Sequence, residues 1–533
     1  MIVSLPAITA LARAGAVERA WSLFHASGFD TRSDDAAALA VKGRLLKSRA
    51  RLAAGIIRLE GFAAAAGAYA AADRLAPAPY LAINAATSRL LAGDPAAAAL
   101  QARAVLTVLD GPEPPADTPY YLAATRAEAL LLAGDPAGAE TAMAQAALVD
   151  PDGWADRAVT LAQLEEVGAA LDCDLDWLER FRPPASLHFA GHIGIAAGGA
   201  AEASLVAQVD AVLAAERVGF GYGALAAGID IVVAERLVAA DAELHVVLPT
   251  SAERFEQQSV SPAGDAWVGR YWHLLERATS IKVVDDWQGS AHDRIATRLA
   301  SELAVGATLL KAQSLDAHAV QLVVLDDAGG GFNTAEQARL WRASRGNPQH
   351  VLTLSRETQV SAQFPPEEPD PGRMVAALLA IRLDQPGHPG PASTSSQIAA
   401  QHAPVGQALA GIPPGQIRAG AGQWQVVLTD MAEAAAVISA VLAAAATTPI
   451  SLAVHYAIVT CVRDGAAQTT VPYGAATAVP QRLLDATPPG LCMASEDFAV
   501  ALTTFGIAGL RAELYHQGEP ELGGAVYTLL RAV

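Results

Sequence analysis

Two glycine-rich stretches in the middle of the chain have the composition of loops that bind anions. Gly191-His-Ile-Gly follows a short apolar run, and Gly219-Phe-Gly-Tyr-Gly-Ala precedes an apolar helical pattern. In an open parallel sheet, ligands lie beyond the carboxyl ends of the strands, where glycines let backbone N–H groups and helix N-termini approach a charged group. The predicted chemistry is therefore anion binding. The alternative is that these glycines only make tight strand-to-helix turns.

The two loops belong to a longer segment, 185–355, which also contains Gly223-Ala-Leu-Ala-Ala-Gly-Ile-Asp-Ile and Leu244-His-Val-Val-Leu-Pro. This segment resembles a SLOG-like domain, of the kind found between tetratricopeptide repeats and cyclase domains in bacterial proteins. The resemblance implies that a nucleotide or nucleotide-derived ligand binds here. The residues that it implicates in binding are Gly191, His192, Gly221, Tyr222 and Gly223.

Three polar residues in this segment can be interpreted without a bound ligand. His192 could equally lie on the surface. Asp230 and Glu235 lie on the helix expected after the second glycine loop, where a carboxylate would repel a phosphate. We therefore predict packing or capping roles for these two acids.

A second set of candidate catalytic residues lies near the C-terminus. Residues 473–490 read Tyr-Gly-Ala-Ala-Thr-Ala-Val-Pro-Gln-Arg-Leu-Leu-Asp-Ala-Thr-Pro-Pro-Gly. The segment resembles a motif of class III nucleotidyl cyclases, in which an Asn and, four residues later, an Arg point from one helical face toward the ribose and triphosphate. Ala478 stands at the Asn position, and Arg482 keeps the Arg. The resemblance implies that one essential side chain is missing.

The resemblance covers 372–533 and also concerns the metal ligands. In this family two carboxylates hold two divalent ions, which activate the ribose hydroxyl and neutralise the triphosphate. The apolar run from Val375 places Asp384 at the first carboxylate. The second normally lies in a Gly-Asp-Gly turn, and Ala421 replaces it in Gly420-Ala-Gly. No cofactor is predicted unless catalysis survives, in which case Mg²⁺ or Mn²⁺ is required. Otherwise Asp384 is a surface-loop carboxylate, and Arg482 pairs with a neighbouring acid.

Elements with different patterns must position these residues. Residues 183–360 follow the linker Phe181-Arg-Pro-Pro-Ala and alternate apolar runs with helical patterns, as in a Rossmann-like parallel sheet. Buried strands are expected to begin at positions 186, 243, 281 and 320, helices at about 202–216, 224–240 and 293–313, and a turn at 219–223. The crossovers should be right-handed.

The last part of the chain, 372–533, follows a polar stretch at 363–372 and has a different order of elements. A strand at 374–384, a loop at 385–394, a strand at 423–429, a helix at 431–446 and a hairpin at 451–472 are expected. Asp464-Gly suits the hairpin turn, because this pair readily adopts positive φ. The order predicts an α+β, ferredoxin-like domain.

The first 182 residues show helical periodicity broken by two near-identical segments, Leu90-Leu-Ala-Gly-Asp-Pro-Ala and Leu131-Leu-Ala-Gly-Asp-Pro-Ala. In each, Gly ends one helix, Asp caps the next and Pro takes its first position. A further set of residues recurs with identical spacing, Ala65, Tyr69, Ala72 and Pro77 in one unit and Ala139, Met143, Ala146 and Pro151 in another. The pattern resembles tetratricopeptide repeats, which implies a protein partner. A generic helical bundle is the alternative.

Composition limits the classes of function. The chain has 533 residues, 36 of them basic and 55 acidic, and its net charge of −19 disfavours nucleic acid and anionic lipid as partners. Its three cysteines lack the spacing of a disulfide framework or zinc site, as is usual for a reduced cytoplasm. No signal peptide and no apolar run of about 20 residues is seen, so a cytoplasmic protein without a membrane span is expected.

The combined prediction is a multidomain α and α/β protein with helical repeats, a Rossmann-like sheet and a degenerate cyclase-like domain. We expect a cytoplasmic signalling or scaffold pseudoenzyme that binds a protein, senses a nucleotide-derived ligand and forms a homodimer. Two alternatives remain. The chain could be an adenylate or guanylate cyclase that is active or complemented by a paralogue, or a nucleoside-phosphate hydrolase that acts through its middle domain.

Overall fold

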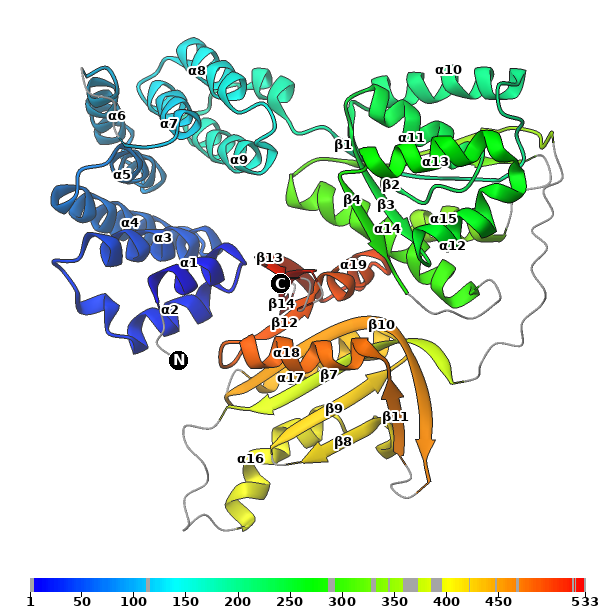
Figure 1. The fold of residues 1–533 in the computed structure, drawn as a ribbon. Helices are drawn as coiled ribbons and strands as arrows, with labels where there is room; N and C mark the ends of the chain where they lie inside the picture. The colour runs from blue at the N-terminus through cyan, green and yellow to red at the C-terminus, as the bar shows by residue number, and fades with distance from the viewer. Residues whose placement is uncertain are drawn as a thin grey trace. The chain divides into compact units, whose positions relative to one another are not determined.

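The chain folds into two compact units, Met1–Pro183 and Pro184–Val533, which divide within the Pro-rich segment after Phe181. Figure 1 shows the computed structural model of both. It describes residues 4–111, 116–285, 293–326, 332–343, 346–357, 372–384, 395–420, 422–445, 448–465, 469–519, 522 and 524–531. The stretches predicted as a domain boundary at 363–372 and as a loop at 385–394 lie almost wholly or wholly outside these residues.

The first unit is built from antiparallel pairs of helices (Figure 1). They are α1 (Leu5–Arg13), α2 (Val17–Ala26), α3 (Ala36–Leu52), α4 (Gly55–Leu75), α5 (Pro79–Leu91), α6 (Pro95–Leu109), α7 (Pro119–Leu132), α8 (Pro136–Val149) and α9 (Trp154–Leu171). The predicted Gly-Asp-Pro breaks are confirmed. Asp94 caps α6 by accepting a hydrogen bond from the Ala97 N–H at 3.0 Å, and Asp135 caps α8 in the same way.

Small residues let neighbouring helices of this unit approach closely. Ala65, Tyr69 and Ala72 of α4 are buried, and a Cβ atom at Gly43 of α3 would lie 2.8 Å from the Tyr69 ring. Helices α3 and α4 can therefore pack face to face only because position 43 lacks a side chain. The closer assignment to tetratricopeptide repeats remains a prediction.

A buried lysine ties four helices of this unit together. The Nζ of Lys47, in α3, donates to Asn84 Oδ1 of α5 and to Gln163 Oε1 of α9, both at 3.1 Å. The Gln163 amide in turn donates to Glu128 Oε1 of α7 at 3.0 Å. Lys47 is only 5% exposed, and this burial lowers its pKa to about 8. Near neutral pH, keeping Lys47 charged in this buried position therefore lowers the free energy of unfolding.

This loss of stability predicts an unusual pH dependence. Because the pKa of Lys47 is lower in the folded than in the unfolded state, the unfolded chain binds this proton more tightly, and the unit should gain stability as pH rises from about 8 to about 10.5. Between pH 7.5 and 9.5 the gain should be about 2 kcal/mol. We expect Lys47→Met to remove it. Urea unfolding of the full chain, followed by pulsed hydrogen exchange in peptides from α3 and α5, measures the difference. An equal rise in the variant would contradict the assignment.

The second unit begins with a six-stranded parallel sheet, which we call the middle domain (185–357). Its strands are β1 (Ala185–Gly191), β2 (Val218–Gly223), β3 (Glu243–Leu248), β4 (Ser280–Val283), β5 (Ala319–Leu325) and β6 (Gln349–Thr353), in the order β4-β3-β2-β1-β5-β6. Its helices are α10 (Ala200–Ala215), α11 (Ile229–Ala239), α12 (Ala252–Ser259), α13 (Asp265–Arg277), α14 (Arg294–Ser314) and α15 (Phe332–Ala343). The predicted parallel sheet is confirmed. The chain reverses its direction of travel between β1 and β5, which makes this the switch point of the sheet.

Three local predictions in the middle domain are wrong. Residues 219–223 form the buried strand β2 rather than a turn, and the helix after them begins at Ile229 rather than 224. The glycines serve packing, because a Cβ at Gly221 would lie 2.3 Å from Leu237 and one at Gly223 would lie 2.6 Å from Phe189. Strand β4 lies at the sheet edge and is exposed, with Ile281 46% accessible, although it was predicted to be buried.

The C-terminal domain (372–531) is a mixed sheet with helices. Its strands are β7 (Arg373–Leu383), β8 (Ile417–Gly420), β9 (Gln423–Leu428), β10 (Ile450–Asp464), β11 (Thr469–Tyr473), β12 (Cys492–Ser495), β13 (Leu510–Glu519) and β14 (Gly524–Arg531). The order is β13-β14-β12-β10-β7-β9-β8, with β11 paired to β10, so the predicted hairpin is confirmed. The helices are α16 (Ser395–Ala408), α17 (Met431–Ala444), α18 (Val479–Ala486) and α19 (Glu496–Thr504).

The middle and C-terminal domains pack on each other through α14 and α19. The Thr504 hydroxyl of α19 donates to the Glu302 backbone carbonyl of α14 at 2.8 Å. The Glu302 carboxylate is 1% exposed and accepts hydrogen bonds from Arg298 at 2.7 Å and from the Tyr456 hydroxyl at 3.3 Å. At the edge of the contact, Arg373 forms ion pairs with the carboxylates of Asp285 and Asp293. The apolar face of α14 is therefore part of the hydrophobic core of the C-terminal domain, whereas most of the parallel sheet packs in a core of its own.

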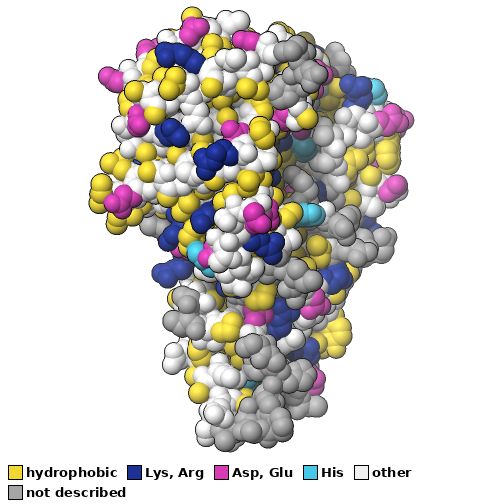
Figure 2. Space-filling view, turned by 90° about the vertical axis from the view of Figure 1, so that its left-hand side faces the viewer, with side chains coloured by type: hydrophobic (Ala, Val, Ile, Leu, Met, Phe, Trp, Pro, Cys, Tyr) yellow, Lys and Arg dark blue, Asp and Glu magenta, His cyan; other side chains and the backbone are white. Residues whose placement is uncertain are grey.

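The surface and the helices bear on possible partners. On the face that Figure 2 shows, described acidic and basic side chains are interspersed, and no broad basic patch is visible among them. Within the described part of the chain, no helix combines the length and the apolar character needed to cross a bilayer. The absence of nucleic acid and lipid partners remains a prediction.

Candidate functional site

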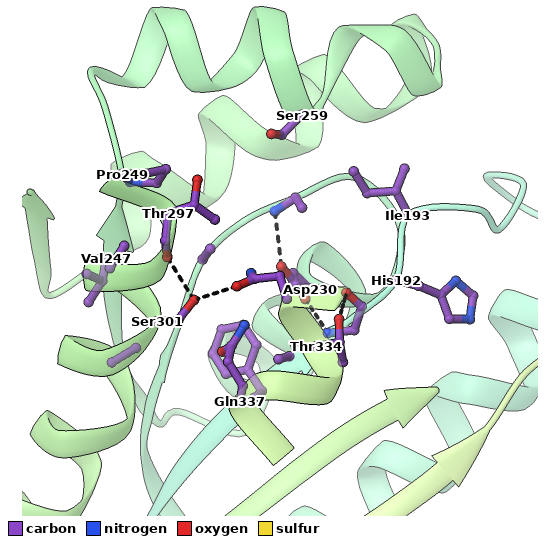
Figure 3. A pocket seen from close by; sticks show the side chains of 18 of the residues that line it. His192, Ile193, Asp230, Val247, Pro249, Ser259, Thr297, Ser301, Thr334 and Gln337 are labelled. Carbon is purple, nitrogen blue, oxygen red and sulfur yellow. Dashed lines mark hydrogen bonds between the residues drawn. The ribbon is translucent and has the colours of Figure 1, made fainter. Parts of the chain in front are cut away.

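A cavity of about 320 Å³ lies at the carboxyl end of β1, beside the switch point of the parallel sheet. Its wall is formed by residues 189–193 at the end of β1, by the start of α11, and by parts of α12, α14 and α15. Figure 3 shows the polar residues that surround it. This is the position at which open α/β sheets bind ligands, and the volume lies at the lower end of the range for small-molecule sites.

Asp230, in the first turn of α11, is the central charged group of this wall. One carboxylate oxygen accepts a hydrogen bond from the Gly191 N–H at 2.8 Å, and the other accepts one from the Ala226 N–H at 3.3 Å. The residue is 7% exposed, and burial raises the pKa of its carboxyl to about 7. Of the predicted packing or capping roles, the structure shows packing: Asp230 joins the end of β1 to the segment that follows β2, and it does not cap α11, whose N-cap residue is Gly228.

The rest of the wall combines hydroxyl and amide groups with apolar surface. The Ser301 hydroxyl donates to the Thr297 carbonyl at 2.9 Å and approaches Asn333 Oδ1 at 3.1 Å. The Thr334 hydroxyl donates to the Gly191 carbonyl at 3.1 Å. Apolar surface comes from Phe189, Val247, Pro249 and Phe255. The cavity can therefore hold a flat apolar body and offer hydrogen bonds to its edge.

Positive charge is scarce around this cavity. Of the described residues that line it, Arg356 alone is positively charged at neutral pH, and it forms an ion pair with Asp326. His192 is 3% exposed, and burial lowers the pKa of its imidazole, so the ring is neutral. The wall therefore carries little charge that could attract an anion.

The residues predicted to bind the ligand are only partly brought together. Gly191 and His192 belong to the wall, but the His192 ring points away from the cavity (Figure 3) and its Nε2 lies 2.8 Å from the Leu354 carbonyl. It is buried, so the surface alternative is wrong. Gly221, Tyr222 and Gly223 do not line the cavity, because they lie within β2, where the Tyr222 ring stacks on His245.

Several lining residues were not identified from the sequence. Ser301, Asn333, Thr334 and Gln337 come from α14 and α15, which are distant in the chain and carry no recognisable motif. Asp230 is recognisable in the sequence as an acid of the expected helix. Its partner Gly191 is not, because it lies 39 residues away.

Asp384, the predicted metal carboxylate, is held by the chain itself. It follows β7, and its Oδ2 accepts a hydrogen bond from the Gly490 N–H at 2.9 Å and another from the Ser451 hydroxyl. Arg382 Nε lies 3.1 Å from its other oxygen, and the side chain is 8% exposed. The alternative of a surface-loop carboxylate is therefore wrong. Both oxygens are engaged by partners within the chain.

The remaining cyclase-like positions lie at the start of α18. Ala478 ends a short turn, η5 (Ala475–Ala478), and is exposed, as is Arg482 in the first turns of α18. Arg382 links this helix to β7, because its guanidinium lies 3.8 Å from the Asp485 carboxylate. Ala421 lies outside the described residues. Among those that are described, no group of three or more His, Cys, Asp or Glu side chains could hold a metal ion.

Comparison with known proteins gives matches in solved structures only. No family model and no curated protein matches the chain. The adenylyl cyclase CyaB from P. aeruginosa aligns at 11% identity over 30% of this chain and 96% of that chain, with a TM-score of 0.25. Adenylate cyclases from Trypanosoma brucei align at 7% identity over 31% of this chain and 92% of theirs, with a TM-score of 0.26. The guanylyl cyclase Cya2 aligns at 10% identity over 30% and 91%, at 0.23. TM-scores this low give no evidence about the activity of this chain.

Proposed function

We propose that the chain is a signalling protein that senses a nucleotide-derived small molecule in the cavity of its middle domain and whose C-terminal domain is cyclase-like but catalytically inactive. The proposal that the C-terminal domain is inactive rests on the hydrogen bonds of the Asp384 carboxylate. Its carboxylate oxygens already accept hydrogen bonds from Ser451 and Gly490 and face Arg382. A divalent ion would have to displace these donors, and the position of its second carboxylate is alanine.

The cavity supports the sensing part of this proposal. It lies where open parallel sheets bind ligands, and its polar groups surround an apolar centre. Exposed apolar side chains at the α3–α4 junction, Leu52, Ile56 and Ile57, support a protein partner for the first unit, since such patches mark interaction surfaces. Pairing of two C-terminal domains is part of the same proposal, and native mass spectrometry would report the mass of the dimer.

An activity assay of the full chain tests the absence of catalysis. With ATP or GTP and Mn²⁺ we expect no cyclic nucleotide above the level of a protein-free control, because the two-metal site lacks its second carboxylate and the transition-state Asn is replaced by Ala478. The matched variant is Arg482→Ala, which should behave identically. Cyclic nucleotide formation that disappears in this variant would establish an active cyclase instead.

The same assay also tests the hydrolase alternative. One observation favours it, namely that the carboxyl of Asp230 faces the cavity with a pKa raised to about 7 by burial, a value suited to a general base. The hydrogen bonds that it accepts from two backbone N–H groups favour the packing role. Release of free base or ribose phosphate, lost in a cavity-blocking variant, would show that the middle domain is an enzyme.

A further inference from the structure

The anion-binding groups expected at the end of β1 are already occupied. In an open α/β sheet, backbone N–H groups at this position approach a ligand phosphate. Here the N–H groups of Gly191 and Ala226 donate to the Asp230 carboxylate instead. The carboxylate thus takes the place that an anionic ligand would fill, and above its pKa of about 7 it adds negative charge to the wall.

No other group in the described wall compensates for this charge. Arg356 is neutralised by Asp326, and the N-terminus of α14 is capped by Asp293, which accepts hydrogen bonds from the N–H groups of Ile295 and Ala296. A phosphate that entered the cavity would lose its hydration and face a buried carboxylate without a free cation nearby. Desolvation and like-charge repulsion would both oppose its binding.

The same arrangement favours a hydrogen-bond donor. An ionised carboxylate has about four acceptor positions, and two of those on Asp230 are used by the backbone. The others can accept from a ligand N–H group. Phe189, Phe255 and Pro249 provide apolar surface for a ring, while Ser301 and Asn333 provide polar contacts at its edge.

We infer that the cavity binds a nitrogen heterocycle of the nucleobase or nucleoside class, which donates an N–H group to Asp230, and that it excludes phosphate. This inference rests on the proposed sensing function and specifies its ligand class. The ring lies against the apolar wall near Phe189 and Phe255, and no phosphate occupies the interior. Asp230 is then the group that determines specificity between a nucleoside and its phosphates.

Calorimetric titration of the full chain with matched ligands tests the class of ligand. The probes are adenosine against adenosine 5′-monophosphate and guanosine against guanosine 5′-monophosphate, all in EDTA. We expect at least one nucleoside to bind about tenfold or more tightly than its monophosphate, because the phosphate cannot be paired in the cavity. A monophosphate that binds as tightly as its nucleoside, or more tightly, would overturn the inference and leave the sensing function intact.

Variants locate the binding site. Ser259→Trp fills the cavity from the partly exposed end of α12. Ser204→Trp makes the same change on the exposed face of α10, where the Ser204 hydroxyl accepts a hydrogen bond from the Gln208 side chain. Nucleoside binding should be lost in the first and kept in the second. Asp230→Asn should weaken binding about tenfold or more, because only the oxygen of the amide, and not its nitrogen, can accept a hydrogen bond. If that variant fails to fold, the tryptophan pair still decides the site.

The remaining outcomes separate this inference from the proposed function. Nucleoside binding that survives in Ser259→Trp would place the ligand elsewhere and overturn the assignment to this cavity. The absence of binding by all four probes would remove the proposed sensing of nucleotide-derived ligands, and the inference with it.

Discussion

Replacing Gly306 by alanine is expected to destabilise the second unit by at least about 2 kcal/mol. Gly306 lies in α14 where this helix crosses α19, and it is buried. A Cβ atom there would lie 2.1 Å from the Thr504 hydroxyl oxygen and 2.3 Å from the Val500 carbonyl oxygen. Both distances are far below a van der Waals contact, and the second involves backbone that cannot rotate away. The two domains would have to separate, and the Thr504 hydrogen bond to Glu302 would be lost.

The control for this prediction is Gly269→Ala in α13. A Cβ at Gly269 has no neighbour within 4 Å, and the residue is exposed. Alanine is the better helix former by about 1 kcal/mol, so this variant should be neutral or slightly more stable. Urea unfolding of the two variants and the parent chain measures the contrast. Equal stability of the two variants would mean that α14 and α19 are not packed as described.

Helix α14 contributes both to the wall of the cavity and to the contact with the C-terminal domain. Thr297, Ser301 and Ala304 line the cavity, while Glu302 and Gly306 contact the C-terminal domain. Helices move as rigid bodies within a packed core, so a displacement of α14 at the cavity also displaces it at α19. The proposed ligand site and the C-terminal domain therefore contact the same helix.

Features encoded by short stretches of sequence could be predicted, and those that depend on distant partners could not. The Asp-Pro starts of α6 and α8 were predictable because the cap and its N–H donor lie three residues apart. The prediction of a turn at 219–223 is wrong because glycine occurs both in turns and in strands on which another element packs too closely for a side chain. Only the packing of Leu237 and Phe189 decides between them.

The two carboxylates of the candidate sites show the same limit. The sequence indicated a packing or capping role for Asp230 rather than phosphate binding, but it could not show that Gly191 is its partner. For Asp384 the family pattern suggested a metal ligand or an exposed loop, and the structure has neither an exposed side chain nor a free oxygen. Its partners Ser451 and Gly490 lie 67 and 106 residues away, so residue spacing could not predict them.

Asp384→Ala is expected to lower the stability of the second unit by about 2–3 kcal/mol. The substitution removes the nearer acceptor of the Ser451 hydroxyl and of the Gly490 N–H, which keep only their longer hydrogen bonds to the Pro488 carbonyl at 3.3 Å and to Ser451 Oγ at 3.2 Å. It also removes the close partner of Arg382, whose side chain is three-quarters buried, and a partly buried charge without its partner is destabilising. Urea unfolding of the full chain measures the loss.

The matched control is Asp485→Ala, which removes the other carboxylate near Arg382. Asp485 is 65% exposed and lies 3.8 Å from the guanidinium, so its loss should cost less than about 1 kcal/mol. The effect of Mn²⁺ on the melting temperature distinguishes a structural role of Asp384 from metal binding. If the carboxylate is purely structural, the melting temperature of the parent chain should not change when Mn²⁺ is added. A rise with Mn²⁺ that disappears in Asp384→Ala would show that the carboxylate binds the ion, and the C-terminal domain would then have to be regarded as a working metal site.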